Sequence, residues 1–137
     1  MTDFLRPARL FDKSENVEVG VLPYGADVVH AAPPYRDTTS DHSWHMFVEY
    51  RFLFSETASY AVSVEYASAE SRPCGIHWDG EFVVPRGLAS ITGGWEEGFQ
   101  VWERQLSVLG GPGIHTLRIS RDREAIPHIR TIKLERQ

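Results

Sequence analysis

Hydrophobic and polar residues alternate along several short segments of the chain, and long stretches with helical spacing are absent. The alternation is clearest in residues 46–54, 60–66 and 115–119. Successive side chains of an extended strand point to opposite faces, so each of these segments can bury one face and expose the other. The pattern therefore predicts a protein that is built from β-strands.

Other segments extend this interpretation to most of the chain. The segment 78–81 contains Asp-Gly, which supplies the positive φ angles of a tight hairpin turn. Residues 121–125 are predicted to form a polar turn, and residues 33–40 the longest loop. Four more segments complete a set of roughly eight or nine short strands: residues 17–22, 27–31, 99–106 and 129–134. Short strands with turns at such spacing predict an all-β fold, a β-sandwich or jelly roll.

Length and composition limit the class of protein. The chain has 137 residues, which suits one domain, and we predict a single domain over residues 1–137. With 42% hydrophobic and 12% aromatic residues it can form a sizeable core. The net charge of −5 argues against a nucleic-acid partner, because nucleic-acid modules usually carry basic patches. No apolar run approaches the ~20 residues of a membrane helix, so no membrane partner is predicted.

The N-terminus and the single cysteine bear on localisation and redox chemistry. Residues 1–6 lack the basic and apolar regions of a signal peptide, which predicts a cytoplasmic protein. If a leader had been trimmed from the chain, the protein would instead be extracellular. Cys74 has no cysteine partner, which excludes an internal disulfide and gives no support to a cysteine-based metal site. We predict a small buried apolar residue there.

A pair of glycines precedes one of the tryptophans. In the segment 92–95, Thr-Gly-Gly-Trp, the glycines allow a sharp turn and place the indole on a loop. An exposed, rigid indole of this kind is suited to stacking against a sugar ring. Trp78 and Trp102, in contrast, lie within strand patterns, and Tyr24 is predicted in a turn that packs over the sandwich.

Several of these segments occur in an order that is known from one protein family. They are residues 44–54, 60–69, 78–80, 92–95 and 113–119. In this order they resemble family 6 carbohydrate-binding modules, over about residues 44–134 of the chain. The resemblance implies a β-sandwich jelly roll of the galactose-binding-like type and non-catalytic carbohydrate binding.

The resemblance also implies the position of the ligand. In that family a cleft lies in the loops at one end of the sandwich, and an aromatic pair clamps a sugar ring. The C–H groups of the sugar pack on the negative faces of the aromatic rings. Trp95 matches one of the clamp residues. Trp44 is the candidate for the second, with Tyr35 in the neighbouring long loop as its substitute.

Polar side chains are needed around such a clamp to fix the sugar hydroxyls. Glu96 and Glu97 directly follow Trp95 and are predicted to accept hydrogen bonds from the sugar. The family often has an asparagine near the start of the last strand, where this chain has His128, which can donate and accept. The predicted partner is an oligosaccharide or polysaccharide.

The family commonly holds a structural calcium ion, which requires several oxygen ligands. The resemblance places one ligand at an N-terminal carboxylate and another at an aspartate of the final strand, where this chain has Arg130. If Glu18 is the N-terminal carboxylate, Arg130 is expected to pair with it and to replace the ion. We therefore predict no cofactor, with structural calcium as the alternative.

Two other functions stay open at this stage. His42, His45 and Glu49, with His115, offer the ligands of a cupin-like jelly-roll enzyme that uses iron, manganese or zinc. However, His42 and His45 are three residues apart and would face opposite sides of a regular strand, and His115 is predicted to be a hydrogen-bonded structural residue. The second alternative is a protein-interaction β-sandwich that has lost its sugar cleft. No nucleophile–base motif is recognisable, so catalysis is not predicted.

Overall fold

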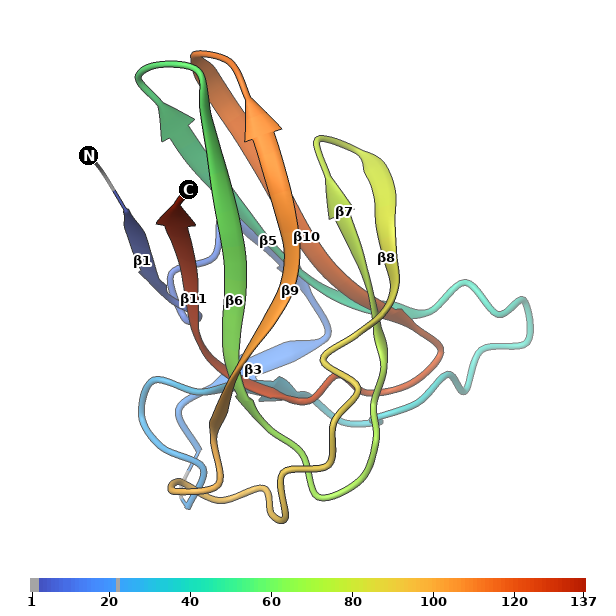
Figure 1. Ribbon diagram of the computed structural model, residues 1–137. Helices are drawn as coiled ribbons and strands as arrows, with labels where there is room; N and C mark the ends of the chain where they lie inside the picture. The colour runs from blue at the N-terminus through green and yellow to red at the C-terminus, as the bar shows by residue number, and fades with distance from the viewer. Residues whose placement is uncertain (1–2, 22) are drawn as a thin grey trace.

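The chain folds into two β-sheets whose inner faces pack against each other (Figure 1). The computed structural model describes residues 3–21 and 23–137, which contain no helix and thus none that could cross a membrane. The prediction of an all-β fold is confirmed. The strands in these residues are β1 (Phe4–Pro7), β2 (Lys13–Glu15), β3 (Val17–Val19), β4 (Val29–Ala31), β5 (His45–Phe54), β6 (Ala58–Ala67), β7 (Cys74–Trp78), β8 (Glu81–Gly87), β9 (Val101–Gly110), β10 (Gly113–Asp122) and β11 (His128–Arg136).

The strand order brings the last strand into the middle of the larger sheet. This six-stranded sheet has the order β3-β4-β11-β6-β9, and β1 also pairs with β11. The second sheet has five strands in the order β2-β5-β10-β7-β8. All of these pairings are antiparallel. Strands that are far apart in the sequence are therefore neighbours in both sheets.

The core lies between the sheets and is formed by the residues that alternate in the sequence. Strands β5 and β6 supply much of it, from Met46, Val48, Tyr50, Phe52, Phe54, Tyr60, Val62, Val64 and Tyr66, all at most 3% exposed. Full burial of one large apolar side chain stabilises a fold by about 1.5–3 kcal/mol. The one polar atom of Tyr50 is satisfied, because its hydroxyl donates to the Ala8 carbonyl at 2.7 Å. Cys74 is fully buried, as predicted.

The structure differs from the sequence analysis mainly at strand ends. Gly20, at φ +78°, follows the end of β3, and Leu22 lies outside the described residues. The predicted strand at 27–31 begins at Val29, because Val28 donates its N–H to Gly25 in a turn. Strand β10 continues to Asp122, which shortens the predicted polar turn. The short strands β1 and β2 were not predicted.

The Asp-Gly turn joins β7 to β8 as predicted. Asp79 and Gly80 have φ angles of 51° and 83°, the left-handed values that a two-residue hairpin turn requires. The Asp79 carboxylate also reaches the neighbouring strand: one oxygen accepts from the Thr116 N–H at 2.8 Å, and the other accepts from Nδ1 of His115 at 2.7 Å. The turn is thus tied to β10 by its own side chain.

His115 is a structural residue, which confirms the prediction for this position. Its second ring nitrogen donates to the Gly111 carbonyl at 2.7 Å, and its ring lies parallel to that of Trp78, with centroids 5.6 Å apart. Both nitrogens can donate only in the imidazolium form. Burial opposes that charge, but the hydrogen bonds to Asp79 and Gly111 outweigh it, and the pKa of His115 is raised.

The two ends of the sandwich differ. The β5–β6 and β9–β10 hairpins lie at one end, and the β3–β4, β6–β7 and β8–β9 connections lie at the other (Figure 1). Asp3 and the C-terminal residues Arg136 and Gln137 lie at the hairpin end. There the backbone N–H of Arg136 donates to the Asp3 carboxylate at 2.8 Å, and that of Gln137 donates to the Ser59 carbonyl at 2.9 Å. The opposite end of the sandwich is formed by the connecting loops.

The Asp79–His115 pair leads to a test of stability against pH. Asp79→Asn keeps an acceptor for the Thr116 N–H and tolerates positive φ, but it removes the charge that faces the imidazolium. We expect a loss of about 1–2 kcal/mol in the free energy of unfolding at pH 6, measured by urea denaturation. The raised pKa means that this stabilisation is complete below the unfolded pKa near 6.5 and is lost as pH rises through the folded value. The variant should therefore approach the wild type at pH 9, and an equal loss at both pH values would contradict the assignment.

Candidate functional site

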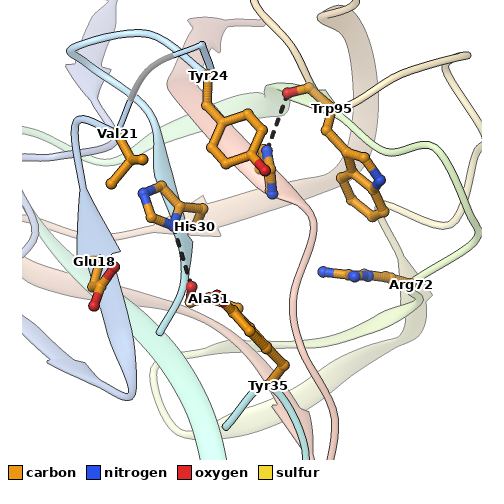
Figure 2. Close-up of a pocket in the computed structure, with 9 residues that line it drawn as sticks. Glu18, Val21, Tyr24, His30, Ala31, Tyr35, Arg72 and Trp95 are labelled. Atoms are coloured by element: carbon orange, nitrogen blue, oxygen red, sulfur yellow. Dashed lines mark hydrogen bonds between the residues drawn. The ribbon is translucent and has the colours of Figure 1, made fainter. Parts of the chain in front are cut away.

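An open cleft of about 420 Å³ lies among the loops at the end of the sandwich opposite the hairpins (Figure 2). Aromatic and ionisable side chains from four parts of the chain point into it (Figure 2). The residues that line it are Glu18, Val21, Tyr24, His30, Ala31, Tyr35, Arg72, Trp95 and His128. The size of the cleft suits a small organic ligand or one end of a longer one.

Two histidines from neighbouring strands form the base of the cleft. Val29 of β4 is paired with Ile129 of β11, and both are fully buried in the core. Since side chains alternate along a strand, the adjacent His30 and His128 project from the other face of the sheet. Their ring centroids are 5.7 Å apart. Glu18 is paired with His30 across β3 and β4 and therefore lies on the same face.

Tyr24 covers these histidines from the β3–β4 loop. Its ring meets His128 edge-to-face at a centroid distance of 4.3 Å and His30 at 5.5 Å. The backbone of this loop is tied to the β8–β9 loop, because Glu97 donates its N–H to the Pro23 carbonyl at 3.2 Å. Two loops thus meet above the base of the cleft.

The Gly-Gly-Trp segment forms one wall. Gly93 has φ +106°, and a Cβ atom on Gly94 would lie only 2.7 Å from the ring of Phe99. Both positions therefore favour glycine, one through its backbone conformation and one through close packing. The Trp95 carbonyl accepts a hydrogen bond from Nδ1 of His128 at 3.1 Å, which fixes the loop to the sheet. The Trp95 ring is half-buried, with its centroid 4.7 Å from that of His128.

Arg72 lies against the same tryptophan. The centre of its guanidinium is 4.1 Å from the centroid of the Trp95 ring, in cation–π contact. Nε and one terminal nitrogen are each 3.1 Å from one carboxylate oxygen of Glu70, and the other terminal nitrogen donates to the Ile126 carbonyl at 3.1 Å. Each nitrogen of the guanidinium therefore already has an acceptor in the protein.

Tyr35 is the most exposed aromatic residue of the cleft. Its side chain lies on the β4–β5 loop, and the residue is 54% exposed. It follows the cis Pro33–Pro34 peptide and has φ 68°, and its N–H donates to the Ala32 carbonyl at 3.2 Å. Figure 2 shows the ring on the side of the cleft opposite Tyr24. A flat ligand has an accessible ring face at this position.

The hydrogen bonds determine what the histidines offer to a ligand. Burial lowers the pKa of His128 to about 4, so this imidazole is neutral at neutral pH. Because Nδ1 of His128 donates to the Trp95 carbonyl, Nε2 carries the lone pair and accepts. His30 likewise places Nδ1 3.2 Å from the Ala31 carbonyl, and within the described residues its buried Nε2 has no hydrogen-bond partner. A ligand hydroxyl group can therefore donate to Nε2 of His128, whereas Nε2 of His30 has no exposed surface at which to accept.

The structure brings three of the sequence-predicted site residues together: Trp95, Tyr35 and His128 all line the cleft. Trp44 packs against the hydrophobic core instead. Glu96 and Glu97 are exposed and are not among the described residues that line the cleft.

Six residues that line the cleft were not proposed as ligand-binding residues: Glu18, Val21, Tyr24, His30, Ala31 and Arg72. His30 had a signal in the sequence, since it is the one polar residue within the apolar stretch 28–32. Tyr24 and Arg72 had none, because only the strand order brings their loops to the same end of the sandwich.

The expected pairing of Arg130 with Glu18 is wrong. Arg130 lies 4.0 Å from the carboxylate of Glu65, which also accepts from the Thr131 hydroxyl at 2.8 Å. Arg130 and Thr131 stand at a β-bulge opposite β6, so Arg130 is directed to a carboxylate of that strand rather than of β3. Glu18 instead lies at the cleft.

The ligand set of the cupin-like alternative is dispersed. His42 lies 3.5 Å from Asp37, His45 lies 2.8 Å from Glu15, and Glu49 pairs with Arg118 at 3.1 Å. In residues 3–21 and 23–137, no group of three or more histidine, cysteine, aspartate or glutamate side chains is placed to hold a metal ion. The geometry does not favour a metal-dependent enzyme.

Comparison with solved structures identifies the fold. The chain superposes on a family 35 carbohydrate-binding module from Paenibacillus barcinonensis (TM-score 0.74, 20% identity) and on one from Clostridium thermocellum (0.73, 17%), covering 98% of each chain and of this one. It also superposes on the C-terminal family 6 module of LamC, a laminarinase from Zobellia galactanivorans (0.61, 16%), with 98% of this chain and 99% of that chain covered. No model of a protein family matches the sequence, and no curated protein matches it. The fold is thus the β-sandwich jelly roll that family 35 and family 6 modules share.

The protonation of His128 can be tested directly. We expect the His128 ring to titrate with a pKa of about 4 in an NMR pH series. Above that pH the ring should carry its proton on Nδ1. The His128→Asn variant serves to assign the signals. Because the unfolded chain takes up a proton near pH 6.5, stability should fall as pH decreases from there through the folded pKa. A midpoint at or above pH 6.5 would contradict the buried, neutral imidazole.

Proposed function

We propose that the protein binds carbohydrate in the cleft between Trp95 and Tyr35 without catalysing a reaction. The observation that carries this proposal is the combination, in one open cleft, of an accessible aromatic face with a hydrogen-bond acceptor, Nε2 of His128. Sugars need both, because their C–H faces pack on aromatic rings and their hydroxyls require fixed polar partners. The fold, shared by modules of two carbohydrate-binding families, supports the same function.

The two aromatic residues would have different functions. The Trp95 ring is already in contact with Arg72 and His128, so it serves mainly as a wall of the cleft. Tyr35 presents the more accessible ring and is the better stacking surface. Nε2 of His128 then accepts a hydrogen bond from a hydroxyl group at the base of the cleft.

A binding experiment tests this proposal. The wild-type protein should bind members of an array of oligosaccharides and polysaccharides, and isothermal titration calorimetry should give an affinity for the best-bound glycan. Tyr35→Ala and Trp95→Ala should each weaken that affinity about tenfold, since loss of an aromatic contact costs about 1.4 kcal/mol.

Trp102→Ala provides the matched control. Trp102 is a 45% exposed tryptophan on β9 that contacts Lys133 and does not line the cleft. The Trp102→Ala variant should bind the glycan with the same affinity as the wild-type protein. Equal losses in all three variants, or no glycan bound by the wild type, would contradict the proposed function.

A further inference from the structure

Negative charge outweighs positive charge around the cleft. Glu18 lines it, and Glu96 lies close enough to act on His128 electrostatically. Arg72 is the only cation among the described residues that line the cleft, and its charge is offset by Glu70. The other titratable groups that face the base are Tyr24, Tyr35 and the two histidines. An anionic ligand would therefore enter a region of net negative charge.

The hydrogen-bonding groups at the base agree with this charge balance. His128 is neutral and presents a lone pair at Nε2. A hydroxyl group can donate to such an acceptor, but a carboxylate cannot, because it has no hydrogen to give. A carboxylate at this position would leave Nε2 of His128 unsatisfied and would bring its own charge near that of Glu18.

We infer that the cleft selects neutral sugars and discriminates against the corresponding uronic acids, with Glu18, Glu70 and the imidazole of His128 as the determinants. This selectivity rests on the proposed carbohydrate binding and adds the chemical class of the ligand. Cations do occur nearby, since Arg36 and Arg121 border an adjoining hollow of about 280 Å³ that shares Tyr35 and Arg72 with the cleft. Arg121 is paired there with Glu124 at 2.8 Å. Arg36 is thus the one cation of that hollow that could attract a carboxylate.

Matched sugar pairs test the selectivity, because the members of each pair differ only at C6. The probes are the methyl glycosides of galactose and galacturonic acid, glucose and glucuronic acid, and mannose and mannuronic acid, titrated at pH 7 and low salt by protein-observed NMR. In the pair that binds best, the neutral sugar should bind about fivefold or more tightly than the acid, which corresponds to one charge repelled at short range. High salt should reduce the difference.

Two variants test which residues cause the discrimination against uronic acids. Glu18→Gln and Glu70→Gln should each lower the ratio of neutral to acidic affinity, by about threefold for one removed charge. Glu81→Gln removes an equal charge from the β7–β8 hairpin, outside the cleft, and should leave the ratio unchanged.

The outcomes separate the two proposals. A uronic acid that binds as tightly as its neutral counterpart would overturn the selectivity and leave carbohydrate binding intact. Loss of that acid binding in Arg36→Gln would then locate the carboxylate in the adjoining hollow and overturn the selectivity of the cleft as proposed. If neither member of any pair binds, and the glycan array is also negative, the proposed function itself fails.

Discussion

The pairing of β11 is the constraint on which both the core and the cleft depend. This strand is bonded to β6 on one side and to β4 and β1 on the other. Its inward residues Ile129, Ile132 and Leu134 are fully buried, while His128 at its start projects from the other face. A shift of one residue in this register would move the imidazole into the core and an isoleucine into the cleft. The strand therefore sets the position of the site through the same pairing that fills the core.

Much of the fold followed from the sequence, because alternation records which side of a strand is buried. The Asp-Gly turn and the long strands β5, β6 and β10 were predictable in this way. Strands β1 and β2, with four and three residues, are too short to show a period. In the site, the Gly-Gly pair indicated the Trp95 loop, whereas Arg72 and Tyr24 reach it from connections whose meeting depends on strand order. Trp44 has the same residue type as Trp95 but precedes a buried strand and packs on the core.

Two histidines in this small domain have pKa values that are shifted in opposite directions. At one end, His115 has acceptors at both nitrogens, which raise its pKa and favour the cation. At the other end, burial lowers the pKa of His128 and favours the neutral ring. The first needs low pH and the second needs higher pH for its full contribution, so these two groups together stabilise the domain most between their two titrations. The neutral ring is also the one whose lone pair faces the cleft.

The positions of the chain ends have a practical consequence. Asp3 and Arg136 are joined by a hydrogen bond at the hairpin end, and the cleft opens among the loops at the opposite end (Figure 1). A fusion partner or a surface anchor attached through either terminus would therefore hold the domain with its cleft directed outward.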